Sequence, residues 1–599
     1  MPRRRDRGVG WAAWGWGAHG MMPRNAGQAA SARANRMSGL SSPLPDTRRW
    51  QLFDGSGWQF LLPPSPFRRL LCYDNLGGAT LLLSVGLAEE VLVVHHDPEE
   101  LERLRAIAAD AGLGDVRFAD AGADLAPEGA DGFDGALVHD PEARVLRRDR
   151  GPGPAVDALC ARFAAVLRPR GFLYLGLRNR FAYRQLRQPS GSAPRFLSVG
   201  AATRAVRRAG LRPLPSHPFL LDGTRIAEIV PPAGYRSAKN RFLPTERIRE
   251  LLLRGWGRRN LAPAYGVIGF RGTPEPSWLE HLLADPWVQS LAPRSALRRC
   301  LVLNEGKLML SLGPARAPHG TVVLVVTPES LASDRRRAEG EWLRRLAALP
   351  PAVARVIPVF HGEREIEGVR VFALSERPGL TVDRDAPFLP ALTAAAAGWL
   401  REFHRATVRP AEIDAALFAR AFAPLFEKAR ARNRALSMEI TGLEELVRSR
   451  LAGRVLPLAW MHGDFKLENL VFDERTRTVQ GVIDWELAWE PGPPLLDLLY
   501  LLLYNRVVRA GTGVTGVLAA AQATLVRQDW TPNERVHLDA HHAASLGGSR
   551  GLETTLGALF LVHHIGVRVT YNLSWAETLT RLRDLLSALR ERLAALDAF

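Results

Sequence analysis

The sequence predicts two different folds in one chain: a doubly wound α/β domain in the N-terminal half and a two-lobed α+β region in the C-terminal half. Between residues 70 and 177, short apolar runs alternate with helix-like segments, an order typical of a parallel sheet with helices on both faces. After residue 300, apolar runs separated by glycine-containing turns indicate an antiparallel meander. After residue 389 the apolar residues mainly recur with helical spacing. The chain of 599 residues is also too long for a single hydrophobic core.

The composition of successive segments suggests where these domains begin and end. The first fifty residues carry arginines, glycines and tryptophans without a helical or strand period, and we interpret them as a disordered tail or as an over-extended start of the reading frame. A later stretch is rich in proline, arginine and glycine and contains one amphipathic helix, which favours a connector. The expected segments are a tail at 1–50, the α/β domain at 51–233, the connector at 234–291, a small α+β lobe at 292–388 and a helical lobe at 389–599.

Each element of the α/β domain has a local signal. Apolar and β-branched runs predict strands at 70–73, 91–94, 116–118, 133–138 and 172–177. Helical periodicity predicts helices at 79–87 and 155–167. A further helix begins after Asp97, because Asp97 is a typical N-cap, Pro98 suits the first helical position and two glutamates fill the first turn.

The C-terminal half changes pattern twice. The small lobe has predicted strands at 300–303, 307–312, 321–326, 354–360 and 369–374, with one helix at 333–349. The helical lobe then opens with an apolar stripe at helical spacing that includes Leu392, Ala396, Leu400 and Phe403. The exception to the helical pattern in this lobe is the compact stretch 461–486.

The net charge of +17 does not by itself indicate a nucleic-acid partner. Only four of the 79 basic residues are lysines, and the arginines are spread along the chain, usually among acidic residues. With abundant alanine, glycine and proline, this composition favours a coding bias and a solvated surface. We therefore expect no nucleic-acid partner, although anionic ligands such as phosphates are favoured electrostatically.

Cysteine content and apolar runs restrict the class of protein further. The three cysteines lie far apart without metal-ligand spacing, so neither a disulfide framework nor a zinc ribbon is expected, and a reducing cytoplasm is the predicted location. The longest apolar run, 495–508, is interrupted by Asp497, Asn505 and Arg506. We interpret this run as a buried helix and predict no membrane span.

One stretch carries the residues that phosphoryl transfer requires. It reads His-Gly-Asp-Phe-Lys-Leu-Glu-Asn-Leu-Val-Phe from His462, and later Ile-Asp-Trp-Glu around Asp484. Transfer from ATP needs a carboxylate beside the attacking hydroxyl and oxygen ligands that hold Mg²⁺ against the phosphates. Asp464 and Asn469 lie on a loop that leads into a β-run, and Asp484 closes a second β-run. A hairpin would therefore place Asn469 and Asp484 side by side, with Asp464 nearby.

These motifs resemble the aminoglycoside phosphotransferase and choline kinase family, which is related to the protein kinases. The resemblance covers roughly residues 292–599 and implies a kinase-like bilobal fold. It implies that Asp464 is the catalytic base or hydroxyl-orienting residue, that Lys466 neutralises the transferred phosphoryl group, and that Asn469 and Asp484 bind Mg²⁺. It also implies that Asp497 supports the loop, and that His462 packs beneath it rather than acting as an acid or base.

The nucleotide-binding part of the resemblance is less complete. Residues 374–379, with Glu376, resemble the hinge whose backbone meets the adenine, and Glu339 matches the glutamate that normally pairs with an ATP-binding lysine. Val325 stands where that lysine is expected, and little beyond Gly306 remains of the glycine-rich turn. Lys307 on the neighbouring strand, or an arginine such as Arg335, is a candidate replacement for the missing cation.

The N-terminal half resembles the class I methyltransferases over residues 53–230. The match lies in Leu-Arg-Pro-Arg-Gly-Phe-Leu from Leu167, which is similar to a helix end and strand of that family. Its S-adenosylmethionine loop is reduced to Gly77 and Gly78. The ribose-binding acid is expected near His95, where Asp97 is the closest carboxylate and also a helix cap. A degenerate scaffold domain is the favoured interpretation, with S-adenosylmethionine as a second candidate cofactor.

The sequence thus predicts a kinase that uses ATP and Mg²⁺ to phosphorylate a hydroxyl of a sugar, an amino alcohol or a related metabolite, joined to a methyltransferase-like accessory domain. Two alternatives stay open: a methyltransferase that uses S-adenosylmethionine and has a kinase-like partner domain, and a non-catalytic, pseudokinase-like binding module. The acceptor and the oligomeric state are not readable from the sequence.

Overall fold

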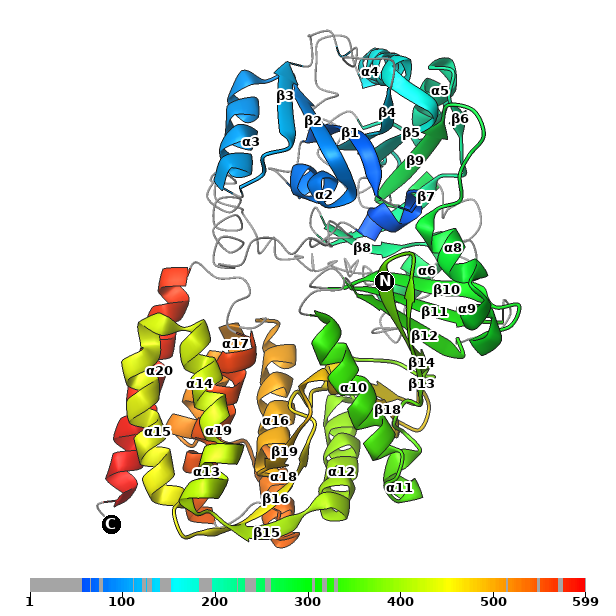
Figure 1. Ribbon diagram of the computed structural model, residues 1–599. Helices are drawn as coiled ribbons and strands as arrows, with labels where there is room; N and C mark the ends of the chain where they lie inside the picture. Colours follow the sequence, from blue (N-terminus) through cyan, green and yellow to red (C-terminus); the bar gives the residue numbers. More distant parts are fainter. Residues whose placement is uncertain are drawn as a thin grey trace, which may run out of the picture.

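One mixed sheet extends through both halves of the computed structural model (Figure 1). The structure describes residues 57–64, 66–74, 79–110, 112–120, 125, 132–140, 152–182, 196–222, 225–231, 244–253, 260–303, 307–314, 320–327, 332–512, 515–546, 550–568 and 575–597. The predicted tail at 1–50 lies outside these residues, as do Gly77, Gly78 and Gly306.

The N-terminal half contributes the following elements: η1 (Gly57–Leu61), β1 (Phe67–Asp74), α2 (Ala79–Leu87), β2 (Ala88–His95), α3 (Pro98–Asp110), β3 (Val116–Asp120), β4 (Phe133–Asp140), α4 (Pro152–Val166), β5 (Leu167–Arg178), α5 (Val199–Arg208), β6 (Arg212–Pro213), β7 (His217–Asp222), β8 (Arg225–Ile229), α6 (Pro244–Leu252), β9 (Ala264–Phe270), α8 (Trp278–Ala284) and α9 (Pro286–Leu291).

Strands β1 to β5 form a parallel sheet in the spatial order β3-β2-β1-β4-β5. Buried residues of α2 and α3 pack on one face of this sheet, and those of α4 and α5 pack on the other. Asp97 caps α3, since its Oδ1 accepts a hydrogen bond of 3.0 Å from the Glu99 amide. The order of the strands reverses at β1 and β4, the position where open α/β sheets commonly bind ligands. The resemblance of this half to methyltransferases stays a prediction.

Part of the stretch that we expected to be a connector is a central strand of the sheet. β9 is antiparallel to β5 over seven residue pairs, from Phe172–Phe270 to Arg178–Ala264, and is buried throughout. Its sequence, Ala-Tyr-Gly-Val-Ile-Gly-Phe, has two glycines that weaken the strand signal. The packing needs one of them, because a Cβ atom on Gly269 would lie 2.3 Å from Val206 Cγ1 of α5.

Replacing Gly269 by Ala is therefore expected to destabilise the N-terminal half by about 1–3 kcal/mol, the usual cost of overpacking a core. The exposed Gly200 on α5 is the matched control, since a Cβ there approaches only the tip of Arg204, at 3.5 Å. Thermal unfolding should show a lower midpoint for Gly269→Ala and an unchanged or higher midpoint for Gly200→Ala. Equal midpoints for the two variants would contradict the close packing of α5 on β9.

The C-terminal half begins with a small lobe made of β10 (Ala296–Val302), β11 (Leu308–Gly313), β12 (Val322–Thr327), α10 (Ala332–Leu346), α11 (Pro351–Ala354), β13 (Phe360–Ile366) and β14 (Val369–Ser375). The strand predicted at 354–360 is wrong. A proline pair starts the short helix α11 there, and Val353, Val356 and Ile357 are apolar because they enter the core of the helical lobe. β13 is a mostly polar edge strand and lacks the apolar signal.

A single hydrophobic cluster, here called the shared core, joins the two halves. It contains buried side chains from η1, α2, α3, α8 and both parts of the sheet, including Phe60, Leu81, Tyr174, Ile268, Trp278, Cys300, Leu310, Leu324 and Val371. Strand β10 pairs with β8 at Leu301 and Glu228, which connects the two parts of the sheet. The small lobe therefore packs one face on the N-terminal half. Its other face, which carries Val325 and Leu374, is turned away from this core.

The helical lobe contains α12 (Leu389–Thr407), β15 (Arg409–Glu412), α13 (Ala415–Ala421), α14 (Ala423–Arg432), α15 (Ser437–Leu451), β16 (Val455–Met461), η6 (Leu467–Asn469), β17 (Leu470–Phe472), β18 (Val479–Val482), η7 (Trp485–Leu487), β19 (Trp489–Gly492), α16 (Leu495–Ala510), α17 (Thr515–Ala521), α18 (Pro532–Ala543), α19 (Glu553–Arg568) and α20 (Trp575–Asp597).

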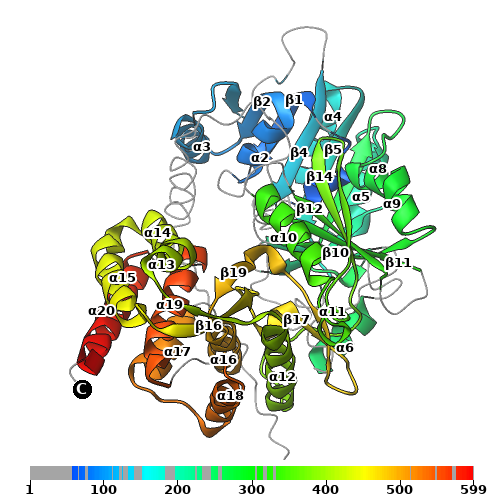
Figure 2. The ribbon, with the colours of Figure 1, turned by 60° about the horizontal axis from the view of Figure 1, so that its bottom comes forward.

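The helices of this lobe lie together (Figure 2), and their buried side chains form a second large core. The apolar run at 495–508 is the buried helix α16, as its polar interruptions predicted. In the described part of the chain, no helix combines the length and the apolar character that crossing a membrane requires.

Candidate active site

A β-hairpin brings Asn469 and Asp484 together. Strands β17 and β18 are antiparallel, and beyond their last pair the Ile483 amide donates a hydrogen bond of 3.0 Å to the Asn469 carbonyl oxygen. Asn469 therefore lies at the start of the hairpin and Asp484 just after its end. Asp484 has left-handed backbone angles, φ 68° and ψ 56°, a conformation that Asp and Asn tolerate better than most residues.

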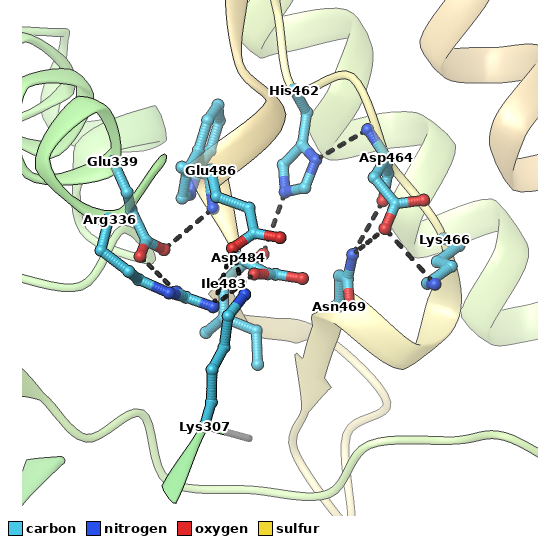
Figure 3. Close-up of polar contacts among 11 residues, drawn as sticks. Lys307, Arg336, Glu339, His462, Asp464, Lys466, Asn469, Ile483, Asp484 and Glu486 are labelled. Carbon is cyan, nitrogen blue, oxygen red and sulfur yellow. Dashed lines mark hydrogen bonds and ion pairs between the residues drawn. The ribbon is translucent and has the colours of Figure 1, made fainter. Parts of the chain in front are cut away.

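Asp464 is held by the loop that joins β16 to this hairpin. The Asn469 side-chain amide donates to both the carbonyl oxygen and Oδ2 of Asp464, each at 2.9 Å. Lys466 Nζ lies 3.3 Å from Asp464 Oδ2 and 3.2 Å from Glu468 Oε2. Since the Asn469 nitrogen is turned to Asp464, its amide oxygen is the atom left to face the hairpin side, where Asp484 lies (Figure 3).

The backbone of this loop is fixed from beneath by the buried Asp497 of α16. Its two carboxylate oxygens accept hydrogen bonds from the His462 amide at 2.8 Å and from the Gly463 amide at 2.9 Å. Only glycine suits position 463, because φ is +79° and a Cβ atom would lie 2.2 Å from the Leu487 carbonyl oxygen. Asp497 also lies 3.4 Å from Nε2 of the buried His404.

His462 has a supporting position. Its Nδ1 accepts from the Asp464 amide at 3.3 Å, and its Nε2 lies 3.0 Å from the Ile483 carbonyl oxygen. These partners require a neutral ring with its hydrogen on Nε2. The side chain therefore ties the loop to the hairpin.

Five charged residues gather at one side of the hairpin end, and three of them, Lys307, Arg336 and Glu339, are buried. We call this group the charge cluster, and it consists of Lys307, Arg336, Glu339, Asp484 and Glu486 (Figure 3). Arg336 forms an ion pair with Glu339, lies 3.3 Å from Asp484 Oδ1 and lies 3.1 Å from Glu486 Oε2. Lys307 Nζ lies 2.8 Å from the same oxygen of Glu486. The Trp485 amide donates to Glu339 Oε1 at 3.0 Å, which fixes α10 to the chain beside Asp484.

The electrostatics of the charge cluster favour a charged Arg336. Burial acts against this charge, but the three surrounding carboxylates outweigh burial and raise the pKa of Arg336. Burial raises the pKa of Glu339, and the neighbouring Arg336 opposes that shift. The guanidinium is therefore a permanent positive charge beside Asp484.

Comparison with known protein families finds a match in this region. Residues 315–533 match the phosphotransferase enzyme family. The match includes α10, the loop with Asp464, the hairpin and Asp497, and it gives the C-terminal half a kinase-like phosphotransferase fold. A comparison with curated proteins finds no match.

Solved structures with partial similarity include phosphotransferases and one methyltransferase. Aminoglycoside phosphotransferase APH(2″)-Ib, in an ADP-bound structure, is 16% identical, with 49% of this chain and 93% of that chain covered and a TM-score of 0.30. APH(3″)-Id from Streptomyces rimosus is 18% identical, with 43% and 89% covered and a TM-score of 0.28. The N-methyltransferase NodS from Bradyrhizobium japonicum is 11% identical, with 42% and 98% covered and a TM-score of 0.21.

The structure changes the expectation for the cation that pairs with Glu339. The phosphotransferase resemblance places a lysine at position 325, but Val325 is a buried residue of β12 that pairs in register with Met309 and Phe372. The partner of Glu339 is Arg336, one turn earlier on the same helix. We had considered Arg335 as the substitute cation, but the ion pair with Glu339 is formed by the next residue, Arg336. Lys307 does reach the site, through Glu486.

Glu376 makes its hydrogen bonds within the small lobe, whereas Lys307 belongs to the charge cluster. Its amide donates to the Thr321 carbonyl oxygen at 2.9 Å, and its side chain accepts a hydrogen bond from Ser311. Burial raises the pKa of the Glu376 carboxyl. Its amide and carboxylate are thus engaged within the small lobe, so binding of adenine by this residue stays a prediction.

Of the candidate residues of the N-terminal half, Asp97 alone lies within the described residues. Asp97 is exposed and acts as the cap of α3, while Gly77 and Gly78 lie outside the described residues. Among the described residues, no group of three or more His, Cys, Asp or Glu side chains is arranged to hold a metal ion, and this includes the histidines of α18.

Sequence reasoning missed the roles of Arg336 and Glu486. Glu486 belongs to the Ile-Asp-Trp-Glu motif, yet no partner for it could be inferred from that motif alone. Arg336 lies among three consecutive arginines, only one of which faces inward. The spacing of three residues to Glu339 was the available signal, because such residues share one helix face.

Proposed function

We propose that the protein is an ATP- and Mg²⁺-dependent phosphotransferase that phosphorylates a hydroxyl group of a small molecule. The single observation that carries this proposal is the arrangement of Asp464, Asn469 and Asp484 around one hairpin, in a region that matches the phosphotransferase enzyme family. A base and two hard oxygen donors in this arrangement supply what phosphoryl transfer requires.

The proposed role of Asp464 is to orient the acceptor hydroxyl and take its proton. The acceptor oxygen then forms a bond to the γ-phosphorus while the bond from that phosphorus to the departing ADP oxygen breaks. Asn469 holds the Asp464 carboxylate in place. Lys466, whose Nζ is 3.3 Å from Asp464, supplies positive charge next to the transferred phosphoryl group.

The chemistry of the donors fits Mg²⁺. Asp484 offers a carboxylate and Asn469 an amide oxygen, the hard ligands that this ion prefers, and the left-handed backbone at Asp484 turns the carboxylate toward Asn469 (Figure 3). With ATP bound, the metal would neutralise phosphate charge. Asp484 is also the residue that links these donors to the charge cluster.

The helical lobe gives one indication about the acceptor. A polycationic acceptor needs acidic groups that have no cation of their own, but Glu553 is paired with Arg535 and His542, and Glu534 with Arg506. These two glutamates therefore do not form an acidic acceptor site. A sugar, an amino alcohol or a related metabolite remains the proposed class. None of the described residues favours methyl transfer over phosphoryl transfer.

Transfer of radiolabelled γ-phosphate from ATP to a panel of sugars and amino alcohols tests the proposal. We expect Mg²⁺-dependent label in at least one acceptor and none after addition of EDTA. Calorimetric titration with ATP and Mg²⁺ provides an independent readout. If the folded protein neither binds ATP nor transfers phosphate, the proposed function is refuted and the inert binding module is favoured.

Replacing Asp484 by Asn is expected to raise the Mg²⁺ concentration needed for half-maximal activity by roughly 10-fold or more, because a neutral amide replaces an ionised ligand. Asn also tolerates the left-handed backbone at this position, so the fold should persist. Rates measured across a magnesium titration check this result. An unchanged magnesium requirement would contradict the assignment of Asp484 as a metal ligand.

A further inference from the structure

The charge cluster contains a cation that no family motif supplied. Arg336 extends from α10 into the space between Glu339, Asp484 and Glu486, and only 8% of its side chain is exposed. Burying a guanidinium this deeply is costly unless its partners repay the desolvation. Three carboxylates within ion-pair distance do so, and their positions make Arg336 the link between helix α10 and the proposed metal ligand.

The charge cluster contains more carboxylates than cations, which a purely structural ion pair would not require. Three carboxylates, Glu339, Asp484 and Glu486, face two cations, Arg336 and Lys307. The surplus negative charge favours a divalent cation at Asp484. If a metal took part of the negative charge of Asp484, Nη2 of Arg336 would become available as a donor to an anionic group beside that metal.

The exposed edge of the cluster lies at Asp484. A third of the Asp484 side chain is exposed, at 33%, whereas the side chains of Glu339 and Glu486 are 4% and 12% exposed. The Arg336 nitrogen nearest to this edge is Nη2, the atom that contacts Asp484. A phosphate that shares the metal with Asp484 would therefore meet the guanidinium first.

On this basis, and resting on the proposed function, we infer that Arg336, assisted by Lys307, binds the phosphates of the nucleotide and replaces the lysine that is missing at Val325. The guanidinium comes from the glutamate-bearing helix instead of from strand β12. Glu339 and Glu486 are then positioning residues: Glu339 orients Arg336, and Glu486 holds Arg336 and Lys307 beside each other.

If Arg336 binds phosphate, replacing it should weaken the binding of some nucleotides more than others, whereas a purely structural role would weaken the binding of all of them. A phosphate contact is lost only for ligands that carry phosphates, whereas a damaged fold weakens binding of every nucleotide. Adenosine, ADP and ATP, the last two with Mg²⁺, therefore form the test series. The chain offers a matched control in Arg337, which is exposed, lies on the same helix and contacts Glu363 instead of the cluster.

Calorimetry on the full chain should compare the wild type with Arg336→Met, Lys307→Met and Arg337→Met. For Arg336→Met, the ratio of ATP affinity to adenosine affinity is expected to fall roughly 10- to 100-fold, as for the loss of one charge-assisted phosphate contact. Lys307→Met should lower the same ratio. Arg336→Lys should recover part of it, and Arg337→Met should leave it unchanged.

If Arg336→Met fails to fold because the cluster keeps uncompensated carboxylates, the double variant Arg336→Met with Glu339→Gln removes both members of the closest ion pair. The same fall in the ratio is expected for this double variant. A ratio equal to that of the wild type in the folded single or double variant would overturn the inference while leaving the proposed function intact. Wild-type protein that binds neither ADP nor ATP would instead refute the proposed function.

Discussion

Replacement of Asp464 by Asn is expected to lower kcat for phosphoryl transfer by roughly 10²- to 10⁴-fold, the usual contribution of a positioned general base. An amide has nearly the same shape as a carboxylate and can still accept the hydrogen bond of 2.9 Å that Asn469 donates to Asp464. It cannot take a proton from an acceptor hydroxyl. The variant should therefore stay folded and bind ATP with Mg²⁺ at close to wild-type affinity while losing turnover.

Initial rates with a saturating acceptor, together with calorimetric ATP titration, measure the two effects separately. Asp473→Asn is the matched control, because Asp473 is a partly exposed residue of the neighbouring hairpin turn, where it accepts backbone hydrogen bonds that Asn can also accept. Should Asp464→Asn and wild type turn over at equal rates, the observed activity would belong to a contaminating enzyme.

Replacement of Asp497 by Ala is expected to have the largest effect on stability. It would leave the buried amides of His462 and Gly463 without their acceptors, which are now 2.8 and 2.9 Å away. At about 1–3 kcal/mol for each stranded donor, the loss of unfolding free energy is about 2–6 kcal/mol. The loop with Asp464 should also lose its fixed position, so activity is expected to fall at temperatures where the protein remains folded.

Urea unfolding followed by circular dichroism, with activity measured at low temperature, checks this prediction. Asp497→Asn keeps one acceptor oxygen and should lie between Ala and wild type. The exposed Asp385 provides the control, and its Ala variant should behave as wild type. Unfolding midpoints that do not differ between Asp497→Ala and Asp385→Ala would mean that the loop is held by other contacts.

Local signals predicted the parts of the fold in which the chain determines its own conformation. The helix after Asp97 begins with a cap, a proline and acidic residues, and the structure starts α3 at Pro98. The β17–β18 hairpin could be expected because its strands are close in sequence and apolar. Strand β9 could not, since its two glycines hide its strand character until the packing is known: Gly269 lies against Val206 of α5, and Gly266 lies against Phe219 and Tyr174.

The candidate site was predictable to a similar degree. The loop motif implied Asp464, Asn469 and Asp484 as neighbours, and the structure places Asn469 beside Asp464 and Asp484 just beyond the hairpin. Arg336 was not predictable, because choosing among three consecutive arginines requires the direction in which α10 faces. That direction is set by Glu339 and the Trp485 amide, 146 residues later in the chain.

The pairing of β8 with β10 has a practical consequence for anyone who wishes to shorten this protein. A chain cut after β9 would uncover the hydrogen-bonding edge of β10 and the apolar residues that now face the shared core, among them Cys300 and Leu310. An unpaired edge strand next to an exposed apolar surface promotes aggregation. We therefore expect the C-terminal half to aggregate when it is produced without the N-terminal half.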